Sequence, residues 1–192
     1  MTKIFFAALT ASVVVFPVVA LAQAVPAPSV VVVDVQRATS QCNACKTALT
    51  QLEGQVNSLK ALQTSLESPL RTEAASIQTA GAALNGRAPD AALQARVTAF
   101  EKKQTDAQRT LAGREASFQR NREYVLKQIG DKLTPAFATV MTRRNANVML
   151  DAANIVRSAA GLDVTADVIA ALNATLPSIS TTAPAQAAPA RR

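Results

Sequence analysis

The two cysteines, Cys42 and Cys45, have a Cys-x-x-Cys spacing and are the residues of this chain best suited to site chemistry. Zinc binding needs about four ligands. The chain contains no histidine, so a zinc site would require several chains to pool their cysteines. A thioredoxin-like redox site belongs in a βαβ setting, which this sequence lacks. In an oxidising compartment a local disulfide is the expected state, with two free thiols as the alternative. Its loop is very short, so it would brace the start of the next helix and add little global stability.

Other residue patterns give little support for enzyme chemistry. Without histidine the chain lacks the commonest general base. It has no nucleophile motif, glycine-rich phosphate loop or paired carboxylates, and its acidic residues are scattered at spacings typical of a solvated helix surface. We therefore predict no enzymatic activity, no metal and no cofactor.

Positive charge is concentrated in the middle of the chain. The whole sequence has a formal net charge of +7 and a pI near 10.0. Residues 45–144 include 15 Lys or Arg against nine Asp or Glu, a net charge of +6. Such a segment attracts acidic proteins, lipid or lipopolysaccharide head groups, or nucleic acid. The alternative is a solvated helical face on which Lys and Arg only maintain solubility.

The first residues have the pattern of a secretory signal peptide, predicted for residues 1–22. A basic residue, Lys3, precedes the apolar run Ile4–Val19, and cleavage is expected after Ala22 or, as a second choice, after Ala24. A retained membrane anchor is the alternative, but the run is shorter than the roughly 20 residues that a spanning helix needs. Export to the periplasm makes nucleic acid an unexpected partner.

Two short hydrophobic strands are expected on either side of a long helical segment. A Pro/Ala linker, residues 23–29, precedes the β-branched strand Val30–Val35, which should be buried on both faces. A first body segment, residues 30–44, leads into a helical hairpin over residues 45–142. Its outgoing helix carries apolar residues at spacings of three and four, beginning at Leu49.

The turn of this hairpin is expected at residues 85–90, where Asn, Gly and Pro gather and Asp90 can cap the returning helix. The outgoing helix should be about 60 Å long at about 1.5 Å per residue. Pro69 lies inside it, so a bent arm is expected. Several polar residues interrupt the apolar stripes. We interpret them as residues that fix the register of the two helices or, alternatively, that keep the arm loosely packed: Gln63, Glu73, Gln104, Arg114 and Asn121.

The second body segment, residues 143–176, is expected to contain a β-hairpin of Val148–Ala152 and Ile155–Ser158, followed by a helix capped by Asp163 or Thr165. Residues 177–192 are rich in Ala, Pro and Thr and are predicted to be disordered. The body has under about 70 residues, too few to form a comfortable core alone, so oligomerisation is expected.

The ending of the chain resembles the Skp/OmpH family of periplasmic chaperones. Val148-Met149-Leu150-Asp151-Ala152-Ala153-Asn154 and Leu162-Asp163-Val164-Thr165-Ala166-Asp167-Val168 are similar to the "VVDAN" strand and "DITxxV" helix that close the family's sequences. The order of signal peptide, valine-rich strand, charged hairpin and this ending is similar along essentially the whole mature chain. The Cys-x-x-Cys pair and the Pro/Ala tail depart from the best-known members, and the length and curvature of the arm cannot be carried over.

The resemblance implies an α+β fold: a β-body of about three strands and a short helix, with a long antiparallel helical-hairpin (coiled-coil) arm, assembled as a homotrimer. Unfolded outer-membrane proteins would be held between the arms without ATP. The residues expected to join the copies are Val31, Val33, Val35, Val148, Leu150 and Ile155. Diffuse client contacts are expected from Lys60, Arg71, Arg87, Arg96, Lys102, Lys103, Arg109, Arg114, Arg120 and Arg122.

The predicted function is an ATP-independent periplasmic holdase, with an anionic lipid or lipopolysaccharide surface as a further partner. An adaptor is the alternative: a coiled-coil protein of the cell envelope that binds one folded partner or the anionic membrane surface. A redox enzyme that uses Cys42 and Cys45 is the third class considered. A holdase would keep many unrelated unfolded proteins in solution, whereas an adaptor would bind one folded protein.

Overall fold

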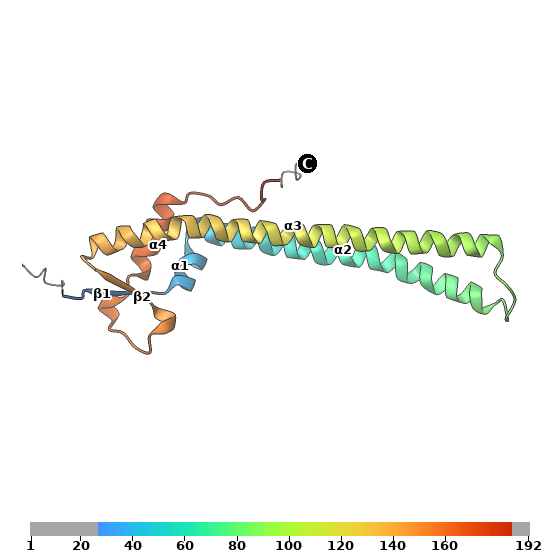
Figure 1. Ribbon diagram of the computed structural model, residues 1–192, viewed down its shortest axis with the longest axis horizontal. Helices are drawn as coiled ribbons and strands as arrows, with labels where there is room; N and C mark the ends of the chain where they lie inside the picture. Colours follow the sequence, from blue (N-terminus) through green and yellow to red (C-terminus); the bar gives the residue numbers. More distant parts are fainter. Residues whose placement is uncertain (1–26, 186–192) are drawn as a thin grey trace, which may run out of the picture.

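A small body with one long projecting arm makes up the molecule, seen in a computed structural model that describes residues 27–185 (Figure 1). The elements follow in the order β1 (Val30–Val33), α1 (Val35–Gln41), α2 (Asn43–Ala82), α3 (Ala91–Arg143), β2 (Val148–Asp151), the short 3-10 turns η1 (Ala152–Asn154) and η2 (Ala160–Leu162), and α4 (Thr165–Thr175). Both ends of the arm return to the body. The predicted signal peptide and most of the predicted linker lie outside the described residues.

The sheet of the body contains two parallel strands within residues 27–185. β1 pairs with β2 in a register that places Val30 opposite Val148 and Val33 opposite Asp151. Parallel strands need a long crossover connection, and here the whole arm supplies it. The prediction of about three strands with a β-hairpin is wrong for this part of the chain. The Asp151 side chain accepts a hydrogen bond from the Ala153 amide (3.1 Å) and starts η1, so the chain turns away before Ile155–Ser158 can pair.

A helix, α1, begins where the first strand was expected to continue. The Asp34 carboxylate accepts a hydrogen bond from the Arg37 amide (2.7 Å) and caps this helix. Val35 is therefore helical, and the predicted strand Val30–Val35 ends at Val33. α1 stops at Cys42, whose backbone is extended, and α2 begins directly after it at Asn43. The arm thus leaves the body through a sharp break between two helices.

The arm is an antiparallel pair of helices, as the sequence predicted, and α2 and α3 separate toward the tip in Figure 1. Its tip, residues 83–90, includes two residues with positive φ, Asn85 (47°) and Gly86 (86°), the chemistry expected for a tight turn. Asp90 caps α3 by accepting the Leu93 amide (2.7 Å). Pro69 lies inside α2 and Pro135 inside α3. Neither proline has an amide hydrogen for the helix ladder, which favours bending at these positions.

The hydrophobic core fills the body and the root of the arm. α1, α4 and the body ends of α2 and α3 supply most of its members, and β1 contributes Val31 and Val33. Leu52 on α2 and Val125 on α3 mark the outer limit of full burial. Leu49, expected on the apolar seam, is 47% exposed. It lies on a solvent-facing side of α2, which is buried instead through the small residues Ala44 and Ala48.

The segment after α4 is ordered along its described part, contrary to the prediction for residues 177–192. Residues 177–185 run from the end of α4 along the root of the arm (Figure 1). Ile179 packs against the hydrophobic core. Side chains of α2 and α3 bind the backbone that follows. Residues 177–185 contain neither helix nor strand, but these tertiary contacts give the segment a fixed course.

Candidate client-binding surface

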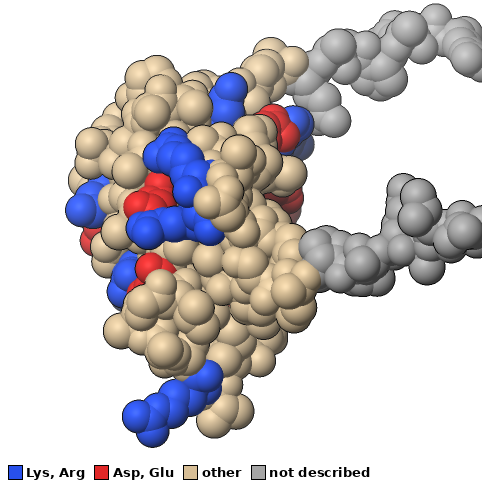
Figure 2. Space-filling view, turned by 90° about the vertical axis from the view of Figure 1, so that its left-hand side faces the viewer, with Lys and Arg blue, Asp and Glu red and all other residues tan. Residues whose placement is uncertain are grey.

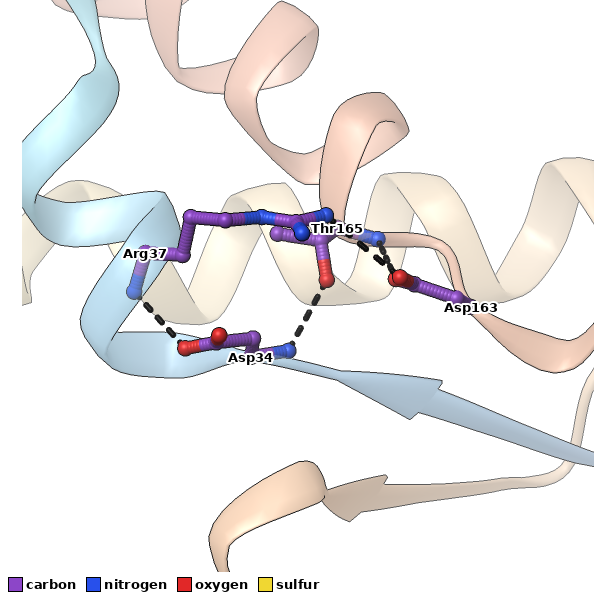
Figure 3. Close-up of polar contacts among 4 residues, drawn as sticks. All are labelled: Asp34, Arg37, Asp163 and Thr165. Atoms are coloured by element: carbon purple, nitrogen blue, oxygen red, sulfur yellow. Dashed lines mark hydrogen bonds and ion pairs between the residues drawn. The ribbon is translucent and has the colours of Figure 1, made fainter. Parts of the chain in front are cut away.

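A polar cluster in the body joins the end of β1 and the start of α1 to the last helix, α4 (Figure 3). The Asp34 amide donates to the buried hydroxyl of Thr165 (2.9 Å), which joins the end of β1 to the start of α4. The Thr165 amide in turn donates to Asp163 (2.8 Å), and the Arg37 guanidinium lies 3.4 Å from the same carboxylate. The prediction that Asp163 or Thr165 caps the last helix is wrong, because the N-cap residue of α4 is Val164, which makes no side-chain cap hydrogen bond. Asp163 nevertheless accepts the amide of Thr165, the first residue of α4. This cluster sets the direction in which α1 and then α2 leave the sheet.

The charge of Asp163 is stabilised by its neighbours. Hydrogen bonds from the Thr165 side chain and amide lower the pKa of the Asp163 carboxyl below its ordinary value; partial desolvation opposes them, and the nearby Arg37 cation adds a smaller lowering. Folding therefore favours the ionised form of Asp163. The cluster is strongest wherever this carboxylate is charged.

The two cysteines form a disulfide, and both are fully buried in the core of the body. Cys42 also ends α1, and its sulfur accepts the Cys45 amide at 3.1 Å at the start of α2. Thiol exchange requires access to a sulfur, which this burial denies while the body is folded. The pair braces the break between α1 and α2, the role expected from its spacing.

The ten basic residues expected to contact clients are spread along both helices of the arm, and all ten are exposed. Three of them have a carboxylate partner within 4.0 Å: Arg71 with Glu67, Lys103 with Glu73, and Arg109 with Asp106. Seven have no such partner among residues 27–185: Lys60, Arg87, Arg96, Lys102, Arg114, Arg120 and Arg122. The structure does not bring the ten into one site. They form a distributed cationic surface.

Polar contacts cross between the two helices of the arm. Lys103 donates to Glu73 at 2.7 Å, and the Arg96 guanidinium donates to Ser76 at 2.9 Å. Nearer the body the Asn121 amide donates to Gln55 at 2.9 Å. Glu73 and Asn121 are two of the predicted polar interruptions, and each makes a specific contact that favours one register of the hairpin.

The residues predicted to join copies of the chain divide into two groups. Val31 and Val33 are buried in the chain's own core, at 7% and 2% exposure, and Val35 packs against that core. Val148 and Leu150, 36% and 43% exposed, lie on β2 with apolar side chains open to solvent, and Ile155 is half-buried. Only the second group is available to a second copy. Two further exposed apolar side chains of the body, missed from sequence, are Val156 and Leu162.

The end of the molecule opposite the tip is mostly uncharged. Figure 2 looks onto this end and shows Lys and Arg with Asp and Glu between them, on a surface dominated by other residues. In the body an ion pair joins Arg144, after α3, to Asp167 on α4. Among residues 27–185 no helix is both long enough and apolar enough to cross a bilayer.

A groove between α2, α3 and the C-terminal segment was not predicted. It has a volume of about 910 Å³ and is lined by Leu59 and Leu62 from α2, Phe118 and Arg114 from α3, and Ala183 from the segment itself. Four side-chain amides at its body end bind the segment: Gln51, Gln55, Asn121 and Gln128. The spacing of Gln51 and Gln55 by four residues, and of Asn121 and Gln128 by seven, places each pair on one helix face. This spacing is visible in the sequence, but it does not distinguish these amides from others on a solvated helix face.

Comparison with known proteins places this architecture in a family. Residues 29–172 match a family model described as outer membrane protein (OmpH-like). A crystal structure from Caulobacter crescentus CB15, described as a candidate OmpH-like outer membrane chaperone, is similar with a TM-score of 0.67 and 20% sequence identity. The similarity covers 82% of this chain and 90% of that one. No curated protein matches the sequence.

Proposed function

The chain belongs to the OmpH-like family, and on that premise we propose that it is an ATP-independent holdase chaperone of the periplasm. It binds unfolded outer-membrane proteins and prevents their aggregation, without catalysis. The description of the Caulobacter crescentus structure as a candidate outer membrane chaperone supports this proposal. The expected resemblance to the family is confirmed by the match over residues 29–172.

One observation carries the proposal: the arm projects from the body, and no side chain between residues 53 and 124 is fully buried. Most of its surface is therefore open to another molecule. The excess of Lys and Arg gives this surface a positive field that attracts acidic chains before contact. A long, open, cationic arm suits many weak contacts with a non-native protein better than one tight contact with a folded partner.

Client binding is proposed to be diffuse. An unfolded protein that keeps many conformations retains chain entropy, which a tight site would remove. Seven arm cations without a carboxylate partner in the described chain can turn toward an acidic client without breaking an ion pair. Because exposed charges interact through solvent, capture should weaken as salt screens the field.

A homotrimer is proposed as the working assembly. The exposed apolar side chains Val148, Leu150 and Val156 lie on the body, at the opposite end from the tip. Their burial between copies would leave three arms free to surround a client. Replacing Val31 or Val33 would not test this assembly, because both valines are buried in the chain's own core. Leu150→Asp and Val156→Asp change exposed positions and should give monomers with intact secondary structure.

The proposed function is tested by aggregation suppression and light scattering with a urea-unfolded β-barrel outer-membrane protein. The wild-type chain should suppress aggregation at stoichiometric amounts and form a complex of defined mass. A fourfold variant, Lys60→Gln, Arg87→Gln, Arg96→Gln and Lys102→Gln, should bind the client several-fold more slowly at low salt. The matched control replaces four exposed cations of the body and root with the same change in net charge: Lys46→Gln, Lys132→Gln, Arg143→Gln and Arg157→Gln.

Equal association rates for the two fourfold variants would show that overall charge, not the arm, attracts the client. Failure to suppress aggregation, together with tight binding of a single folded envelope protein or of anionic vesicles, would replace the holdase with the adaptor function.

A further inference from the structure

The C-terminal segment lies on the arm root in an extended course. Ile179, Thr181 and Ala183 are half-buried, whereas Ser180 and Thr182 between them are exposed. This alternation is the pattern of an extended strand laid on a surface. Within residues 27–185 the segment nevertheless pairs with no strand, so its backbone groups are bound in another way.

Side-chain amides of the helices bind the backbone of this segment. Gln128 on α3 makes two contacts with Ser180: its Nε2 donates to the carbonyl (2.8 Å), and its Oε1 accepts the amide (3.0 Å). Gln55 on α2 donates to the Thr181 carbonyl (3.0 Å). Asn121 accepts the Ala183 amide (2.9 Å). The four bonds satisfy two donors and two acceptors of the peptide backbone.

These amides are oriented by one another. Asn121 Nδ2 donates to Gln55 Oε1 at 2.9 Å across the two helices. This bond leaves Asn121 Oδ1 free to accept and Gln55 Nε2 free to donate to the segment. Among these amides of the described chain, only Gln51 contacts a side chain of the segment, by accepting the Thr181 hydroxyl at 2.8 Å. Apart from Ile179, which packs against the hydrophobic core, the segment is therefore held mainly through its backbone, which every polypeptide shares.

Among the residues that the structure describes, the groove has room beyond the segment that lines it. Its volume of about 910 Å³ extends past Ala183, with Leu59, Leu62 and Phe118 offering apolar surface and Arg114 a cation. The segment lines its part of the groove with small side chains, Thr182 and Ala183. Other extended chains could contact both the amides and the apolar wall.

We infer that this groove is a binding site for extended segments of non-native polypeptide, and that residues 179–183 are an internal occupant which such a segment displaces. The nature of the displacing polypeptide rests on the proposed function. Segments of outer-membrane β-barrels fit this chemistry because their side chains alternate with a period of two. A site that binds extended backbone can hold many such sequences at one register while the cationic arm holds the rest of the client loosely.

If residues 179–183 are an internal occupant of the groove, two sets of variants should have opposite effects on the binding of an added peptide. A tethered segment competes at an effective concentration in the millimolar range, so weakening it should strengthen binding of an added peptide. Loss of groove amides should weaken that binding. Each backbone hydrogen bond contributes modestly, and two lost bonds correspond to about tenfold in affinity.

The experiment measures fluorescence anisotropy of a labelled peptide with the sequence of residues 177–185, PSISTTAPA, on the full-length chain. The tail variant Ser180→Pro with Ala183→Pro removes the two donated amide hydrogens and should bind the peptide about tenfold more tightly than wild type. Its control, Ser180→Ala with Ala183→Ser, keeps both hydrogens and should retain wild-type affinity. Circular dichroism checks that each variant keeps its helices.

Groove variants are made in the tail-variant background. Asn121→Leu with Gln128→Leu should lower peptide affinity about tenfold or more, because three of the four backbone bonds are lost. Gln119→Leu, an exposed position on the same helix, is the control and should have no effect. Peptides N-methylated at the positions of Ser180 and Ala183 should bind weakly, whereas methylation at the position of Thr181 should be tolerated. A peptide shuffled at its other positions, with Ile179 and the prolines at 177 and 184 kept in place, should keep most of the affinity.

Equal peptide affinity in wild type and tail variant, or equal binding of the N-methylated peptides, would overturn the inference and leave the segment as a permanent strap. Aggregation suppression by the wild-type chain is measured in parallel. Suppression without peptide binding defeats only this inference, whereas peptide binding at the amides without suppression defeats the proposed function and leaves the backbone site in place.

Discussion

The root of the arm and its outer part differ in how completely they exclude water. Toward the body, side chains of α3 such as Val125 and Val140 are at most 1% exposed. From residue 53 to residue 124 every side chain is half-buried or exposed. The same two helices are thus part of a solid core at one end and a thin seam at the other. The body therefore supplies the stability, and the outer arm supplies accessible surface.

The outer arm is nevertheless kept in register by polar contacts. The Lys103 to Glu73 pair and the Arg96 to Ser76 bond join the helices where burial is incomplete. Exposed contacts of this kind contribute little free energy, typically 0.2 to about 1 kcal/mol. The outer arm should therefore open locally at a lower cost than the body, the property expected of a surface that adapts to its partner.

The largest difference between the body and the outer arm is expected when one leucine in each region is replaced by alanine. Leu172 on α4 is fully buried, whereas Leu66 on α2 is half-buried on the outer seam. Leu172→Ala should lower the free energy of unfolding by about 3 kcal/mol, because it leaves a cavity in the core. Leu66→Ala should cost about 1 kcal/mol, because less apolar surface is lost. Urea denaturation followed by circular dichroism measures both, and equal costs would refute the division into body and outer arm.

A smaller effect is expected from the disulfide. Cys42→Ala with Cys45→Ala should lower the free energy of unfolding by about 2 kcal/mol, since the short loop constrains few conformations of the unfolded chain. Aggregation suppression should survive wherever the variant stays folded. A folded variant without activity would instead support a redox function for Cys42 and Cys45. The wild-type chain should resist reduction under native conditions, because both sulfurs are buried.

The helical hairpin was predictable because its signals are local. Apolar spacing of three and four, the Asn85-Gly86 turn and the Asp90 cap each act within a few residues, and the structure uses all three. The number of strands in the parallel sheet was harder to predict. Val30–Val33 and Val148–Asp151 were found as strands from their composition, but whether Ile155–Ser158 would add a third strand depended on Asp151, whose side chain starts a turn.

The C-terminal segment could not be predicted because its order comes from elsewhere in the chain. Nothing in an Ala/Pro/Thr-rich sequence indicates a fixed course, and Gln51, Gln55, Asn121 and Gln128 resemble any solvated amides on a helix until α2 and α3 are packed together. The end of β1 shows the same limit at short range. A run of valines favoured strand through Val35, but the strand ends at Val33 because Asp34 caps a helix that begins at Val35.

The smallest predicted effect is a pH dependence confined to the body. The lowered pKa of Asp163 means that its stabilisation is fully present above the ordinary carboxyl pKa, near 4. It is lost as the pH falls through the lower pKa of the folded state. The side chain is 45% exposed, so solvent screening keeps the effect below about 1 kcal/mol.

Asp163→Asn should therefore unfold slightly more easily than wild type at pH 7, and the difference should shrink in acid. Urea denaturation at pH 7 and pH 3 measures this, with Asp131→Asn on the exposed surface of α3 as the control. A difference that grows in acid would mean that Arg37 and Thr165 do not stabilise the ionised carboxylate, and that the cluster joining β1 to α4 is held by packing alone.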